Sequence, residues 1–363
     1  LSSSDKVLVK VAVVKTTPET IFFDVERVMD LADYKKTLPP ADDLVLKLNL
    51  SWTKFYPACS TSVWVLDGAL RALFACGQSK DRMLVVENKT VVTDPKEGSR
   101  LNKWNSVLGK YGLSFTSLAD VEWVSVRPKR DLIIFQDMFE EVRIPRLLIG
   151  KNILHLPTVK THGHSVMTGS IKNAFGAFMT EVRHKAHSKI HEVLVDLLII
   201  QDEFCEGTFS VTDGTVLGDG AGPRTMIWKD GNILMASSDM VASDAIQTWI
   251  MFHMDPFELA FLKKAHDLGL GVADPDQIEI VGDFTSVESL PFFDMKAKRS
   301  PVISWDRILR GSFLRDLLFE TSLFQLCIWA SEIYHDVFWY NIVGKGRVKE
   351  FLKSRWGQLY ERF

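Results

Sequence analysis

The sequence predicts an α/β fold, with a mixed or mainly parallel sheet flanked by helices and an aromatic-rich helical C-terminal appendage. Two patterns support this prediction. Up to about residue 284, segments with strand periodicity alternate with segments of helical periodicity, an order that builds a parallel or mixed sheet. Residues 300–363 instead hold four of the ten tryptophans in a mostly helical pattern. We therefore expect an α/β body over residues 1–284 and a helical extension over residues 285–363.

The predicted strands are short segments that are apolar or alternate in polarity, and turn residues separate them. In chain order they lie at residues 6–14, 43–50, 83–86, 144–159 (two strands leading into a histidine-rich loop), 208–212, 233–236 and 277–281. The predicted helices carry apolar side chains three and four residues apart, at residues 61–75, 102–111 and 241–252. Asp239 and Asp255-Pro256 are typical of helix starts, and Gly269 or Gly271 is typical of a helix end.

The composition is that of a globular protein, and it argues against several functional classes. The 363 residues are 46% hydrophobic and carry a formal net charge of −3, so we expect no nucleic-acid partner. The four cysteines form no Cys-x-x-Cys, so we expect no iron–sulfur cluster of the chain's own and a reducing, cytoplasmic location. The longest uncharged run of the extension, residues 321–331, is far below the roughly 20 residues of a membrane span, so no transmembrane span is expected. The sequence begins at Leu1, which leaves any targeting segment undetermined.

Five of the nine histidines lie between residues 156 and 191. On an α-helix, His184, His187 and His191 fall within an arc of roughly 60° beside an apolar face. Such a stripe is suitably placed to border a pocket. The alternative is a row of surface histidines without a site.

His162 and the segment that follows it supply the other candidate site residues. We predict that His162 and at least one of His187 and His191 lie around one cavity with Lys172 and Asn173. His162, His187 and His191 are candidate ligands of a divalent metal of unknown identity, because imidazoles from two segments can converge on one ion. His162, Lys172 and His187 are the candidate catalytic residues, since histidine transfers protons near neutral pH and lysine binds anions.

A glycine-rich segment, Gly218-Asp219-Gly220-Ala221-Gly222-Pro223, is predicted to be a flexible loop whose amides face a ligand. The alternative is a tight connection without a ligand. It lacks the Gly-Lys-Ser/Thr of a phosphate-binding P-loop. Asp213 is expected at the carboxyl end of a strand, where ligands of α/β proteins gather. The candidate ligand-binding residues are Lys160, Thr161, Asn173, Asp213, Gly220 and Gly222.

The chain resembles the "domain of unknown function 362" family over roughly residues 40–285. The resemblance rests on these ordered motifs: Leu156-Pro157-x-x-Lys160-Thr161-His162, Thr168-Gly169-x-x-Lys172-Asn173-x-x-Gly176, His187, Asp213-Gly214, Gly220-x-Gly222-Pro223 and Ser238-Asp239-x-x-Ala242-x-Asp244-Ala245. Many relatives carry ferredoxin-type cysteine runs, and this chain has none. His162, Lys172 and His187 also resemble, in order and spacing, the lysine and histidines of the nickel-pincer lactate racemase family, where the lysine tethers the cofactor. The paired glycines before that lysine are missing here.

The sequence therefore leads us to expect a metal- or cofactor-dependent enzyme that acts on a small anionic metabolite. The racemase likeness favours isomerase or oxidoreductase chemistry over hydrolysis. The alternative is a non-catalytic ligand-binding or assembly protein that contacts a homo-oligomer or another partner through its C-terminal helices.

Overall fold

The computed structural model describes residues 8–90, 92–310, 321 and 323–363, and it confirms the predicted fold class. The strands of the main sheet are β1 (Val9–Lys15), β2 (Leu44–Lys47), β3 (Met83–Glu87), β4 (Phe115–Ser117), β7 (Asn152–His155), β8 (Thr158–His162), β9 (Val166–Thr168), β10 (Gly207–Ala221), β11 (Thr225–Ser237) and β12 (Ile278–Gly282). Eight of these ten strands follow the order β12-β1-β11-β10-β7-β2-β3-β4, and β8, off this path, pairs with both β10 and β9. Most neighbours are parallel, whereas β11 is antiparallel to β1 and β10. Strands β5 (Trp123–Val126) and β6 (Val142–Pro145) form a separate antiparallel pair.

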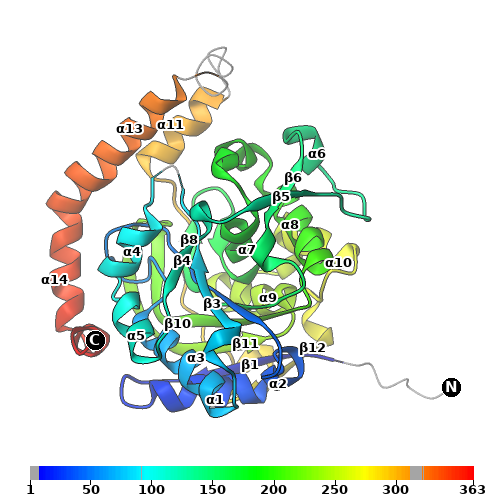
Figure 1. Cartoon of the computed structure of the whole chain (residues 1–363). Helices are drawn as coiled ribbons and strands as arrows, with labels where there is room; N and C mark the ends of the chain where they lie inside the picture. Colours follow the sequence, from blue (N-terminus) through cyan, green and yellow to red (C-terminus); the bar gives the residue numbers. More distant parts are fainter. Residues whose placement is uncertain (1–7, 91, 311–320, 322) are drawn as a thin grey trace.

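Helices cover both faces of the main sheet (Figure 1). In β1, successive side chains point to opposite faces. Val11 and Val13 therefore join one apolar core, and Ala12 and Val14 join the other. The helices of the first core are α7 (Ser170–Phe178), α8 (Ile190–Phe204), α9 (Met240–Phe252) and α10 (Ala260–Asp267). Those of the second are α1 (Ile21–Leu31), α3 (Val63–Ala75) and α5 (Trp104–Lys110), with the shorter α2 (Tyr34–Thr37) and α4 (Pro95–Leu101) at the periphery. The short helix α6 (Phe135–Met138) packs on the first core.

The C-terminal region is helical, as predicted. It consists of α11 (Pro301–Arg310), α13 (Phe324–Glu332), the π-helix η8 (Ile333–Gly344), α14 (Lys345–Lys353) and α15 (Arg355–Glu361). In Figure 1, α11 and α13 lie beside each other at the top of the molecule, and the chain then descends along one side of the body to its C-terminus. Phe351 and Trp356 are buried in the core that contains α1 and α3. Among the described residues, no helix is both long and apolar enough to cross a membrane.

Two strands are longer than the sequence predicts, and they correct two expectations. Strand β10 does not end at Asp213, because Asp213 and Gly214 stay paired with Leu234 and Ile233 of β11. The segment 218–221, expected to be a flexible loop, is the end of the same strand. A backbone irregularity follows Gly214, and an added Cβ on Gly231 would stand 2.2 Å from the Gly214 carbonyl oxygen. These glycines therefore permit close packing inside a hairpin, rather than marking a turn.

The predicted α-helix through His184 and His191 is also wrong. The chain forms the 3₁₀-helix η4 (Glu181–Lys189), and α8 begins only at Ile190. Before Ile190 the segment has few apolar side chains, so it offers no continuous stripe that could pack an α-helix onto the core. A 3₁₀-helix has three residues per turn, so the arc calculated for an α-helix does not apply. The side chain of His184 lies outside the described residues.

Candidate functional site

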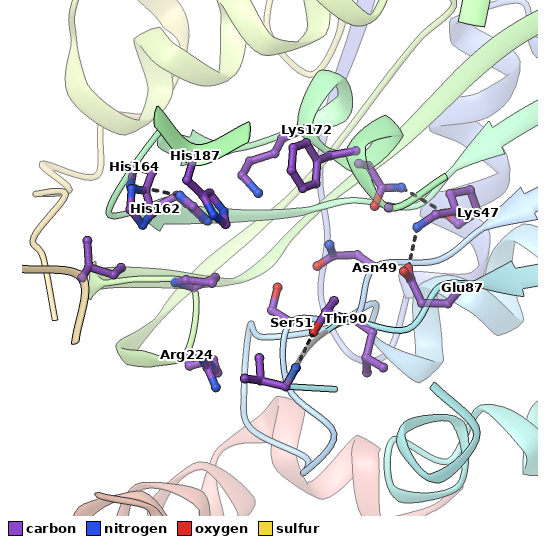
Figure 2. Close-up of a pocket in the computed structure, with 17 residues that line it drawn as sticks. Lys47, Asn49, Ser51, Glu87, Thr90, His162, His164, Lys172, His187 and Arg224 are labelled. Atoms are coloured by element: carbon purple, nitrogen blue, oxygen red, sulfur yellow. Dashed lines mark hydrogen bonds and ion pairs between the residues drawn. The ribbon is translucent and has the colours of Figure 1, made fainter. Parts of the chain in front are cut away.

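A pocket of about 210 Å³ lies where three strands end. Lys47 is the last residue of β2, Glu87 of β3 and His162 of β8, and all three strands run in the same direction. Ligands of α/β proteins gather at this edge of the sheet. Figure 2 shows the side chains converging from these strands, α7 and η4. The polar lining residues are Lys47, Asn49, Ser51, Glu87, Thr90, His162, His164, Lys172, Asn173, His187 and Arg224.

A buried ion pair lies at one end of this pocket. Lys47 Nζ is 2.5 Å from Glu87 Oε2, and the two side chains are only 1% and 4% exposed. The ammonium also donates to the Leu48 carbonyl oxygen at 2.6 Å, and the Asn88 amide donates to Glu87 Oε1 at 2.9 Å. An added Cβ on Gly176 would stand 2.8 Å from Lys47 Nζ. Gly176 therefore lets α7 lie directly against the pair, which accounts for a glycine at this position of the motif.

The start of α7 is held by a carboxylate from α9. Asp244 accepts hydrogen bonds from the Ser170 amide at 2.6 Å and the Ile171 amide at 3.1 Å. An added Cβ on Gly169 would stand 2.2 Å from Asp244 Oδ1, so only glycine fits there without displacing the carboxylate. Burial raises the pKa of Asp244 to about 7. This contact fixes the first turn of α7 and thereby the position of Lys172.

A chain of hydrogen bonds orients the Asn173 amide. Its Nδ2 donates to the Lys47 carbonyl oxygen at 3.1 Å and lies 3.2 Å from His155 Nδ1. The other ring nitrogen of His155 is 2.9 Å from Gln201 Oε1, so His155 donates there and accepts from Asn173. Burial lowers the pKa of His155 to about 3, which keeps the ring neutral. Asn173 Oδ1 is then left buried without a hydrogen-bond partner among the described residues.

Three imidazoles line the same pocket. The His162 Nδ1 accepts from the amides of His164 at 3.2 Å and Ser165 at 3.3 Å. Burial, reinforced by nearby Lys172, lowers the pKa of His162 well below its usual value. The neutral ring therefore carries its proton on Nε2 and is a hydrogen-bond donor. The rings of His164 and His187 stack with their centroids 4.6 Å apart (Figure 2).

This donor set fits an anion better than a divalent cation. A neutral imidazole binds a metal through a nitrogen without a proton, and its other N–H usually donates to an oxygen. In His162 the second nitrogen accepts instead, which leaves the proton on the nitrogen that a metal would need. Glu87, the one carboxylate among the described lining residues, is already paired with Lys47.

Arg224 is a pocket residue that the sequence did not single out. It lies in the turn of the β10–β11 hairpin. The end of β10 next to this turn is bound to β8, because Thr161 Oγ1 donates to the carbonyl oxygens of Gly218 and Gly220. An added Cβ on Gly222 would stand 1.7 Å from the Thr161 carbonyl oxygen, so this close approach requires glycine. Arg224 Nη1 is buried and has no hydrogen-bond partner within the described residues. Thr161, Gly220 and Gly222 thus position the hairpin rather than line the pocket.

The remaining candidates do not line the pocket. Lys160 Nζ donates to Asn49 Oδ1 at 2.5 Å and to the Cys59 carbonyl oxygen at 2.6 Å, and burial lowers its pKa to about 8. Asp213 lines a separate small cavity beside α3. His191 stacks on Phe261 with centroids 5.7 Å apart and does not join His162 and His187.

The sequence contained a signal for the residues that were missed. Lys47 interrupts an apolar strand, and Glu87 ends another. A charged residue in a buried strand is rarely left without a partner. Only the sheet order shows that these two residues face each other. No comparable signal marks Arg224, which a turn brings to the pocket.

The comparison with protein families agrees with the motifs. The family model described as "Domain of unknown function (DUF362)" matches residues 44–248. A thylakoid-associated protein of Synechocystis is 25% identical over 138 residues, which are 37% of this chain and 43% of that relative, so the match spans less than half of the relative's length. A crystal structure of a Thermotoga maritima protein is 13% identical, with a TM-score of 0.37 over 60% of this chain and 55% of that one. Because the family model covers more than half of the 363 residues, the chain belongs to the domain of unknown function 362 family.

Proposed function

We propose that this chain is an enzyme that binds a small anionic metabolite in the pocket and moves a proton on it, as an isomerase does. One observation carries the proposal. Lys47, Lys172 and Arg224 line the pocket together with three imidazoles, while the one carboxylate among its described lining residues is paired with Lys47. The gathering of these cationic side chains in one pocket favours a carboxylate or phosphate as ligand.

The pocket residues suggest a division of roles. Lys172 and Arg224 bind the anionic group, and the N–H of His162 donates to it or to an adjacent oxygen. His164 and His187 exchange the proton, because imidazole transfers protons efficiently near neutral pH. Charge that develops on the ligand when a proton leaves is stabilised by the same cations. Lys160, Thr161 and Asp213 support the surrounding backbone.

Binding is tested first. We expect inorganic phosphate or a panel of small carboxylates, including 2-hydroxy acids, to bind to the purified chain in calorimetric titrations. Arg224→Ala and Lys172→Ala should each weaken binding about tenfold or more, since each removes a charge-assisted contact of roughly 1.5–3 kcal/mol. Lys263→Ala, which alters an exposed pair with Asp267, is the matched control and should bind normally. Unchanged binding in both pocket variants would refute the assigned site.

Proton transfer is tested separately. Ligands that bind are incubated with the chain in D₂O and followed by NMR for exchange of carbon-bound hydrogen. We expect exchange that is lost in His187→Gln although the ligand still binds. Metal content is measured on the same sample. A stoichiometric metal that the exchange requires would contradict our inference that the donors of this pocket fit an anion better than a divalent cation. Binding without any exchange would favour a ligand-binding protein.

An assembly or surface-binding role is the second candidate, and a different observation favours it. The outer face of α13 and η8 exposes large apolar side chains, among them Trp329 at 62%, Phe338 at 55% and Ile342 at 75%. Exposed apolar patches mark contacts with proteins or membranes. The thylakoid association named for the Synechocystis relative is compatible with this role. Sedimentation with and without anionic lipid vesicles tests this role. A chain that stays monomeric and does not bind the vesicles would refute it. We keep a reducing, cytoplasmic compartment as our expectation from the cysteine spacing.

A further inference from the structure

We infer that the ligand is amphiphilic, with its anionic group in the pocket described above and an apolar chain in a second cavity between α11 and α13. This inference rests on the proposed function, because it needs the anionic group to bind first. It adds the class of ligand: an acid or a phosphate ester that carries an alkyl or prenyl chain.

The two cavities adjoin each other. The second has a volume of about 360 Å³, and it shares lining residues with the first: Val92, His164, His187, Arg224 and Ile303. The histidines and the arginine thus stand at the junction. A ligand bound to them has space on both sides.

The two cavities differ in chemistry. Beyond the shared residues, the walls of the second come from one side of α11 and one side of α13. They include Trp305, Leu309, Phe324 and Ile328, and Asp306 is the one charged residue of the described lining that is not shared with the first cavity. Apolar walls next to a cationic pocket match a molecule whose own polarity is divided in the same way.

The position of α11 links it to the site. An added Cβ on Gly163, between His162 and His164, would stand 2.5 Å from Ile303 Cδ1. The glycine of the histidine loop therefore accommodates the first turn of α11. The helix closes over the histidines at this point, and its apolar side chains continue the wall of the first cavity.

The volumes agree with this assignment. The first cavity, at about 210 Å³, is smaller than the roughly 300–1,000 Å³ of common small-molecule sites. The two adjoining cavities taken together come within that range. A short acid would fill only the polar end, and an acid with a chain of several carbons would use both.

The test compares ligands of increasing chain length on the whole chain. Acetate, butyrate, hexanoate, octanoate and the matching alkyl phosphates are titrated by calorimetry below their micellar concentrations. Burying a methylene contributes roughly 0.8 kcal/mol, so the affinity should rise about fourfold per methylene until the chain fills the cavity. The carboxylate and phosphate series identify which anionic group is preferred.

Two variants of α13 locate the chain. Ala330→Trp places a large side chain in the second cavity and should abolish the gain with chain length, while leaving acetate or phosphate binding unchanged. Gln325→Trp, on the exposed side of the same helix, is the matched control and should keep the gain. Thermal melting of both variants checks that they are folded.

The outcomes separate the two proposals. If short anions bind and affinity does not depend on chain length, the amphiphilic ligand is refuted and the anion pocket stands. If the gain persists in Ala330→Trp, the chain binds elsewhere and the assignment of the second cavity fails. If the wild-type chain binds no anion of either series, the proposed function itself fails.

Discussion

Replacing Glu87 with glutamine tests how much the buried ion pair beside the pocket stabilises the folded chain. The variant keeps the shape of the side chain but removes the charge that faces Lys47 Nζ at 2.5 Å. Both side chains are almost completely buried, so water cannot replace the lost carboxylate. Removing one partner of such a pair costs about 3–5 kcal/mol. The remaining hydrogen bond from Lys47 to the Leu48 carbonyl oxygen leads us to expect the lower end, about 3 kcal/mol.

The assay is urea unfolding followed by tryptophan fluorescence and circular dichroism near neutral pH. Glu97→Gln is the control, because its pair with Arg100 is exposed to solvent and should contribute little to stability. The double variant Lys47→Met with Glu87→Leu removes both charges and should regain most of the lost stability, since paired apolar replacements are often neutral. A cost below about 1 kcal/mol for Glu87→Gln, or a double variant less stable than the single one, would refute the reasoning.

Two further predictions concern residues that position the site. Burial holds the pKa of His155 near 3, below its value of 6.5 in an unfolded chain, so its contribution to stability is complete above 6.5 and is lost as the pH falls toward 3. The unfolding free energy of His155→Gln should therefore decrease less steeply on acidification than that of the wild-type chain. Urea unfolding at several pH values measures this, and an equal dependence on pH in the two proteins would contradict the prediction. Gly169→Ala should cost about 2–3 kcal/mol and weaken anion binding, because the new Cβ displaces the Asp244 carboxylate from the start of α7. The control Gly346→Ala, whose Cβ meets nothing within 4 Å, should be neutral or slightly stabilising, and similar melting temperatures for the two variants would count against the contact with Asp244.

The sequence by itself determined the features that depend on neighbouring residues. The side chain of Asp239 caps α9 by accepting from the Val241 and Ala242 amides, as its position before an apolar helical segment predicts. Gly269 follows α10 with a φ of 68°, a conformation that favours glycine. Lys172 and Asn173 reach one pocket with His162 because the short connection through β9 leaves them little freedom to separate.

Only the tertiary structure decided which distant residues meet. The pairing of Lys47 with Glu87 depends on the order of β2 and β3 in the sheet, and the contribution of Arg224 depends on the packing of the hairpin tip on β8. The length of β10 could not be predicted from the sequence either, because Asp213 and Gly214 favour turns locally but are held in the strand by pairing with β11. Likewise, His191 separates from His187 because the chain changes from a 3₁₀-helix to an α-helix between them. In each case the local preference is worth about 1 kcal/mol or less, and packing and strand pairing over many residues outweigh it.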